Sequence, residues 1–165
     1  IQSYRFGRFC PLSERAASSN YMPQKHDVEG FEPDPYLDII LKWDFNFNPL
    51  AWVASQGFFA IIRSVTKQRH AANEGAHNLD DACVEFAFKF PPERFGETPI
   101  YVYGDRSGHS DSHKINGSDF DNVKQYLNNL GFRHVFIKAT KSVVPEAASV
   151  EALNKMFFNG SYLIH

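Results

Sequence analysis

The sequence has few cysteines and no long hydrophobic runs. Cys10 and Cys83 are its only cysteines, and they form no C-x-x-C pair. This excludes a disulfide framework and a zinc site built from thiolates, and it favours the reducing environment of the cytoplasm. The longest apolar runs, such as 58–62, are much shorter than the roughly 20 residues that a membrane-spanning helix needs. We therefore expect a cytoplasmic protein that does not enter a membrane.

Charge of one sign is not in excess, and nucleotide-binding motifs are missing. The chain has 17 Lys and Arg against 19 Asp and Glu, which gives a net charge of −2. A domain whose whole surface is shaped for nucleic acid is strongly basic, so any such partner must bind a local patch. Neither G-x-x-x-x-G-K-[ST] nor G-x-G-x-x-G occurs, so nothing supports a nucleotide-hydrolysing motor or a dinucleotide site.

The sequence is instead rich in aromatic side chains. It has 16 Phe, 7 Tyr and 2 Trp among 165 residues, of which 43% are hydrophobic and 22% charged. This composition excludes intrinsic disorder and predicts one domain with an aromatic core. Residues 1–35 show no sustained period, so we interpret them as a lead-in arm before a domain of residues 36–165. The chain starts at Ile1 and stops at His165 directly after a strand-like stretch, 162–164, so we expect truncation at both ends.

The pattern after residue 35 predicts three consecutive strands. Apolar residues first alternate with polar ones, at Leu37, Ile39, Leu41 and Trp43. A period of two is typical of a strand with one buried face. Two short apolar runs, 51–54 and 58–65, lie on either side of Gln56-Gly57 and predict an antiparallel hairpin. The first three strands therefore form a meander.

Helices and strands alternate in the second half. The apolar spacing of 79–86 predicts an amphipathic helix that Pro91-Pro92 must end, and further helices are expected over 118–130 and 145–158. Ser118 and Asp121 would form a capping box for the middle helix, with Gly131 at its C-terminal end. Strands are expected at 100–103 and, fully buried, at 134–137. The phenylalanines expected in the core include Phe58, Phe59, Phe86, Phe88 and Phe90. We predict an α/β fold: a mixed sheet with a three-strand antiparallel meander, then alternating helices and strands, flanked by helices.

Two aspartates stand where strands end. Asp44 ends the first strand, and Asp105 follows the fourth in Tyr103-Gly104-Asp105. If these strands are parallel neighbours, both carboxylates emerge at one edge of the sheet and could share divalent cations such as Mg²⁺ or Mn²⁺. Two such ions can clamp the attacking and leaving oxygens of a phosphodiester displacement. The alternative is that both aspartates only stabilise turns, as Asp does beside Asn or Gly.

The motifs around these aspartates resemble the nuclease domain of the large terminase subunit of tailed bacteriophages. The resemblance is carried by Trp43-Asp44-Phe45-Asn46-Phe47-Asn48-Pro49, by Tyr103-Gly104-Asp105-Arg106-Ser107-Gly108 and by Ser118-Asp119-Phe120. Residues 20–28, 153–154 and 162–164 are also similar to that family, so the resemblance covers most of the chain. Each motif alone is short, and their order and spacing together make the resemblance specific.

The resemblance implies a ribonuclease H-like fold, whose order of strands and helices is the order expected above. It implies a metal-dependent endonuclease that cuts double-stranded viral DNA during genome packaging in the host cytoplasm. Asp44 would be the first-strand ligand and Asp105 the fourth-strand ligand of a site for two Mg²⁺ or Mn²⁺ ions. The implied partners are double-stranded DNA, an ATPase motor domain of the same protein, the portal and the small terminase subunit.

The third metal ligand of that family is not identified in this sequence. The family places an Asp or His on a C-terminal helix well beyond the fourth-strand aspartate, whereas no Asp follows Asp121 here. Either the ligand lies outside the chain or another acid replaces it. The candidates are Glu85, Glu146 and Glu151, of which Glu85 is a weak one because a solvated or capping acid is its commoner role.

Six basic residues are candidates for DNA contact: Arg63, Lys67, Arg69, Arg106, Lys138 and Lys141. They would bind phosphates without reading bases, although scattered basic residues commonly form only a solvated surface. His109, Asp111 and His113 could in principle hold zinc, but in a Gly- and Ser-rich loop we favour flexible polar groups near the substrate.

Two alternative functions remain open. One is a non-catalytic module that docks DNA or the portal, which the missing third ligand and the net charge of −2 favour. The other is a different ribonuclease H-like nuclease, such as a resolvase, which would use the same acids but prefer another DNA shape.

Overall fold

A computed structural model describes residues 19–27, 30, 32–45, 50–57, 60–65, 79–104, 117–138, 146–159 and 163–164. Its elements in chain order are α1 (Pro23–His26), β1 (Ile39–Asp44), β2 (Ala51–Gln56), β3 (Ala60–Val65), α2 (Leu79–Lys89), α3 (Pro92–Phe95), β4 (Ile100–Gly104), α4 (Asp119–Asn129), β5 (Val135–Ile137), α5 (Glu146–Phe158) and β6 (Leu163–Ile164). No helix in this described part of the chain has the length and apolar character of a membrane span.

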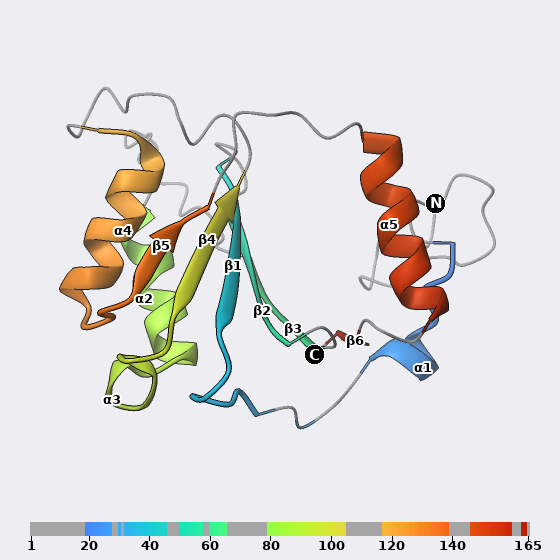
Figure 1. The fold of residues 1–165 in the computed structure, drawn as a ribbon, viewed down its shortest axis with the longest axis horizontal. Coiled ribbons are helices and arrows are strands. Elements are labelled where there is room, and N and C mark those ends of the chain that lie inside the picture. The colour runs from blue at the N-terminus through green and yellow to red at the C-terminus, as the bar shows by residue number, and fades with distance from the viewer. Residues whose placement is uncertain are drawn as a thin grey trace, which may run out of the picture.

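The described strands form one mixed sheet of six strands in the order β5-β4-β1-β2-β3-β6 (Figure 1). The neighbours β1, β2 and β3 run antiparallel, which confirms the predicted meander. Gly57 lies between β2 and β3 with a φ of 61°, a left-handed conformation that favours glycine in the hairpin turn. The remaining pairs are parallel: β4 with β1, β5 with β4, and β6 with β3.

One side of the sheet is buried under helices. We call it the closed face, and its buried side chains on β1, β4 and β5 are Ile39, Leu41, Trp43, Ile100, Val102 and Val135. Helices α2 and α4 lie together on this side, whereas α5 and α1 lie on the other (Figure 1). The inner sides of α2 and α4 contribute Leu79, Ala82, Cys83, Phe86, Phe120, Val123 and Leu127 to the same buried cluster. The core of the domain is therefore the layer between the closed face and these two helices.

The other side of the sheet is more exposed, because neighbouring residues of a strand point to opposite sides. We call it the open face, and on β1, β4 and the end of β5 it carries Lys42, Asp44, Tyr101, Tyr103, Phe136 and Lys138. Lys138 belongs to this group because its backbone N–H donates to the carbonyl of Val102 at 2.8 Å and so continues the pairing of β5 with β4.

Helix α4 has the ends that its sequence predicts. The Ser118 side chain accepts a hydrogen bond from the backbone N–H of Asp121 at 3.3 Å, and the Asp121 carboxylate accepts one from the backbone of Ser118 at 3.1 Å. At the other end the backbone N–H of Phe132 donates to the carbonyl of Leu127, and Gly131 adopts a φ of 107°. This glycine-dependent arrangement ends the helix and returns Phe132 to the core.

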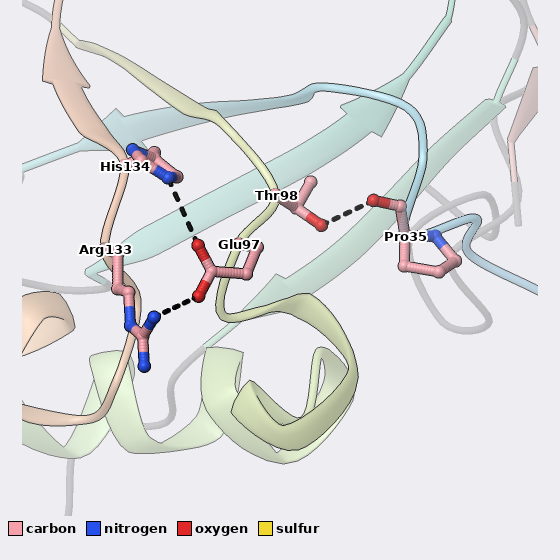
Figure 2. Close-up of polar contacts among 5 residues, drawn as sticks. All are labelled: Pro35, Glu97, Thr98, Arg133 and His134. Atoms are coloured by element: carbon pink, nitrogen blue, oxygen red, sulfur yellow. Dashed lines mark hydrogen bonds and ion pairs between the residues drawn. The ribbon is translucent and has the colours of Figure 1, made fainter.

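Polar contacts fix the edge of the sheet where β4 and β5 begin (Figure 2). The Glu97 carboxylate, just before β4, lies 2.5 Å from the Arg133 guanidinium and 3.3 Å from Nε2 of His134. It thus connects the segment before β4 to the segment before β5. The Thr98 hydroxyl donates to the carbonyl of Pro35 at 2.7 Å. These contacts hold the segment before β1 beside the start of β4.

The segment before β1 also packs on α5. The backbone N–H of Met22 donates to Nδ1 of the buried His26 at 2.9 Å, so Nε2 carries the proton and donates to the carbonyl of Phe157 at 3.0 Å. Asn20 adds hydrogen bonds to the side chain and backbone of Asn154. The region predicted as a lead-in arm therefore includes a short helix, α1, that is attached to the last helix.

The structure corrects the sequence predictions at several points. The sequence predictions do not include helices α1 and α3, in which Pro23 and Pro92 each begin a turn of helix. The expected burial of the strand at 134–137 is wrong for His134 and for Phe136, which is 43% exposed. Phe86 and Phe90 are buried as predicted, but Phe88 is 86% exposed. Phe58 and Phe59 lie outside the described residues.

Candidate active site

The strands that lead to the two candidate aspartates are parallel neighbours. In the register of β1 and β4, Leu41 lies beside Val102 and Trp43 beside Gly104. Asp44 is the last residue of β1, and Asp105 follows Gly104 directly in the sequence but lies outside the described residues. The condition on which the sequence prediction depended, two adjacent parallel strands that end together, is therefore met. The shared position of the two carboxylates stays a prediction.

Asp44 presents an exposed carboxylate at the end of β1. Its side chain is exposed on the open face, and among the described residues no hydrogen bond or ion pair engages its carboxylate. The residues on either side of it in sequence, Trp43 and Phe45, are buried and stacked with ring centroids 5.8 Å apart. The backbone of the strand end is thus anchored in the core while the carboxylate is available to a ligand.

Gly104 allows the end of β4 to lie close to this anchor. A Cβ at this position would come 2.9 Å from the ring of Phe45, 3.0 Å from the ring of Phe120 and 3.0 Å from the carbonyl oxygen of Trp43. Real Cβ atoms do not make contacts of this kind without movement of their neighbours. The absence of a side chain therefore lets two aromatic rings close over the strand just before Asp105.

The candidates for a third ligand lie on different sides of the sheet. Glu85 is half-buried on α2, which packs on the closed face, whereas the Asp44 carboxylate is on the open face. Glu146 and Glu151 belong to α5, on the side of the sheet away from α2 and α4 (Figure 1). In the described part of the chain, no three His, Cys, Asp or Glu side chains gather as a metal site would require. The third ligand thus remains unassigned.

The candidates for DNA contact are only partly described. Lys138 is exposed, and its Nζ lies 5.6 Å from the ring centroid of Tyr101 on the open face. Arg63 lies within β3. The other four, Lys67, Arg69, Arg106 and Lys141, and the possible zinc ligands His109, Asp111 and His113 fall outside the described residues.

Two neighbours of Asp44 on the open face, Lys42 and Tyr103, are not among the residues predicted from the sequence. Lys42 is exposed two residues before Asp44, and it lies beside Tyr103 in the register of β1 and β4. The alternation that predicted β1 also placed Lys42 on the same side as Asp44, so that signal was available. Tyr103 could not be found this way, because the pairing of β4 with β1 is not encoded in either strand alone.

Cys83 is chemically quiet. The thiol is fully buried on α2, and burial together with the negative charge of Asp80 raises its pKa to about 12. A thiol that stays protonated near neutral pH is a poor nucleophile and a poor metal ligand.

The fold of this chain is similar to that of known proteins, although its sequence is not. The sequence matches no protein-family model and no curated protein. The chain is similar to the large terminase nuclease domain of P22, with a TM-score of 0.50 and 14% identity, covering 87% of this chain and 69% of that chain. It also aligns with the foamy viral protease-reverse transcriptase in complex with dsDNA, at a TM-score of 0.42 and 12% identity, covering 68% of this chain and 25% of that chain. The first likeness confirms the predicted ribonuclease H-like α/β fold, the fold of a terminase nuclease domain.

Proposed function

We propose that this chain is a metal-dependent endonuclease that cuts double-stranded DNA, with Asp44 and Asp105 as its catalytic residues. One observation supports the proposal: β1 and β4 are adjacent parallel strands in a ribonuclease H-like sheet, with Asp44 as the last residue of β1 and Asp105 the next residue in the sequence after β4. Neighbouring strand ends at one edge are where an open sheet with parallel strands places its chemistry.

The residues fit a divalent cation. Carboxylate oxygens are the ligands that Mg²⁺ and Mn²⁺ prefer, and Asp44 offers an exposed carboxylate that no described residue engages. Asp44 and Asp105 would hold one or two ions between them. When bound, such ions supply Lewis-acid chemistry that stabilises charge on a phosphodiester. The buried rings of Trp43 and Phe45 would keep the Asp44 backbone in place during turnover.

Helix α5 is the best source of a third ligand among the described elements. It lies on the side of the sheet opposite to α2. Its last turn meets α1, and its first turn lies at the same end of the domain as the ends of β1 and β4 (Figure 1). Glu146 begins this helix and Glu151 lies farther along it. We therefore rank both above Glu85.

We also propose that this nuclease acts in genome packaging. The likeness to the P22 domain supports it, and it would bring a motor domain, the portal and the small terminase subunit as partners. A docking module without activity is the second candidate. It is favoured by the sequence, in which no Asp follows Asp121 to match the third ligand of the terminase family.

Plasmid cleavage in Mn²⁺ tests the proposal. Asp44→Asn and Asp105→Asn should each reduce the cleavage rate on the order of 100-fold, because each removes a carboxylate that would hold the divalent ions, whose positive charge would stabilise the transition state. Asp38→Asn is the matched control: Asp38 is an exposed aspartate just before the other end of β1, and its variant should cut like the wild type. Calorimetric titration with Mn²⁺ should show binding that Asp44→Asn weakens.

The same experiment separates the alternatives. If Asp44→Asn and Asp105→Asn cut as fast as the wild type, the assignment of the site is wrong. If the wild type binds DNA but never cuts, and Mn²⁺ does not bind, the docking role replaces the nuclease. A preference for branched over linear DNA at equal metal would favour a resolvase. Glu146→Gln, Glu151→Gln and Glu85→Gln in the same assay identify the third ligand.

A further inference from the structure

Aromatic side chains lie on the open face, where burial does not explain them. Phe136 is 43% exposed and Tyr103 is 39% exposed. Tyr101 is two residues before Tyr103 on β4 and lies directly beside Phe136 of β5. Its ring stacks on that of Phe136 with ring centroids 5.5 Å apart and planes inclined by 25°. Other rings of the chain are packed in the core, where Phe86, Phe90, Phe120 and Phe132 are almost fully buried. Exposed rings grouped on one face indicate a surface that binds something.

Two lysines accompany these rings. Lys138 places Nζ over the ring of Tyr101, and Lys42 lies beside Tyr103 on the neighbouring strand. Both side chains are exposed, and within the described residues neither forms an ion pair. In a chain with a net charge of −2, this is a local site of positive charge next to π-faces. Asp44, the nearest acid on β1, lies two residues beyond Lys42 at the edge of the sheet.

We propose that the open face of β1, β4 and β5 binds a single strand of DNA, with bases stacked on Phe136 and Tyr103 and phosphates paired with Lys42 and Lys138. Alternation of aromatic platforms with basic side chains is the chemistry by which sheets hold unpaired nucleotides, since every base has a π-face and every linkage has a negative charge.

The spacing of the rings favours an unpaired strand over a duplex. Phe136 lies beside Tyr101 in the register, and Tyr103 is two residues farther along β4, so the two proposed platforms are offset by about 6.6 Å along the strand direction. Stacked nucleotides in a duplex rise about 3.4 Å each, so bases on these two rings would be separated from one another. The bases of a duplex also hide their faces in the stack and cannot lie on an aromatic platform. A protein partner would use the rings but would have no general need for both lysines.

The inference depends on the proposed function for its choice of ligand, and it gives that function a direction. Tyr103 is two residues before Asp105 in the sequence, and Lys42 is two residues before Asp44. A strand held on this face would therefore run toward the edge where the aspartates stand. Such a surface would hold an unpaired segment of the substrate at the edge proposed for cleavage.

Fluorescence anisotropy with a labelled 12-nucleotide oligo-dT tests the inference in EDTA, where no metal or cleavage contributes. The wild type should bind this probe more tightly than a 12-base-pair duplex. Phe136→Ala should weaken binding at least about five-fold, the loss expected for one stacked base, whereas Phe136→Trp should keep it. Lys138→Ala and Lys42→Ala should each lower the slope of log affinity against log salt by about 0.7.

Phe88→Ala is the matched control, because Phe88 is more exposed than Phe136 but lies on α2, which packs on the closed face. Its variant should bind the probe like the wild type. Equal weakening by both phenylalanine variants, or none by Phe136→Ala, would overturn the proposal, and so would tighter binding to the duplex.

Photocrosslinking of the wild type to an oligo-dT that carries 5-iodouracil is independent of any effect on folding. An adduct on Phe136 or Tyr103 is expected, and adducts confined to other elements contradict the inference. Failure of the proposed nuclease is recognised separately, as loss of Mn²⁺-dependent cleavage with oligo-dT binding intact. Cleavage that persists while Phe136→Ala binds normally removes only this inference.

Discussion

The two faces of the sheet use the same kinds of side chain differently. On the closed face, Trp43 and Trp52 are buried, and Phe86 touches Trp52, Phe90 and Phe132 with centroids 4.8–5.4 Å apart. On the open face, Tyr103 and Phe136 keep about two-fifths of their surface in water. Rings on the first face stabilise the fold by removal of apolar area from solvent.

This difference separates stability from function within single strands. Each residue of β1 or β4 belongs to one face, and its neighbour belongs to the other. Leu41 and Trp43 hold β1 in the core, while Lys42 and Asp44 remain available on the open face. A rigid strand therefore positions the proposed site residues without any need to bury them.

The strongest test of the comparison removes one ring from each face. Phe86→Ala should lower the free energy of unfolding by about 3–5 kcal/mol, because it leaves a cavity among rings that cannot all close in. Phe136→Ala should lower it by about 1 kcal/mol or less, as surface substitutions do. Urea denaturation followed by fluorescence measures both. Similar losses for the two variants would show that Phe136 belongs to the core.

A smaller loss of stability is expected from a substitution at Gly104, the last residue of β4. Gly104→Ala directs a methyl group at Phe45 and Phe120, so we expect a loss of about 1–3 kcal/mol from overpacking. Displacement of this strand end should also slow Mn²⁺-dependent cleavage, because Asp105 follows directly. Thermal melting and the plasmid assay are the measurements. An unchanged melting temperature would mean that the rings move away without cost.

The smallest effect concerns pH and the buried thiol of the closed face. In the unfolded chain Cys83 ionises near pH 9, whereas in the folded chain its pKa is about 12. The folded state therefore holds the proton longer, and stability falls as the pH rises from 9 to 12. Cys83→Ala should lose less stability over this interval than the wild type. Parallel curves in urea titrations at pH 8, 10 and 11 would contradict the assignment.

Local patterns in the sequence predicted much of the fold. The alternation of β1, the capping box at Ser118 and the glycine at residue 131 each depend on neighbours within a few residues, and the structure confirms all three. The exposure of Phe136 was not predictable in this way. A short apolar run gives no sign of whether one or both faces of its strand are covered. Among the described elements, α4 contacts β5 on the closed side, while Phe136 on the open face stays partly exposed.

The candidate site depends on the pairing of strands that are far apart in the sequence. Asp44 and Gly104 are brought near one another only because β4 pairs with β1, and neither segment encodes that choice by itself. The sequence could name both aspartates from their positions at strand ends and from the family resemblance. Lys42 and Tyr103 became neighbours only through the register.

The hydrogen bonds of His26 have a consequence for the order of folding. Its ring connects α1 to the carbonyl of Phe157, 131 residues later in the chain. The contact becomes favourable only after the intervening chain is organised, because closure of so long a loop costs entropy that local hairpins and helices do not incur. We expect the junction of α1 and α5 to form after the meander of β1, β2 and β3, and to open first when the protein unfolds.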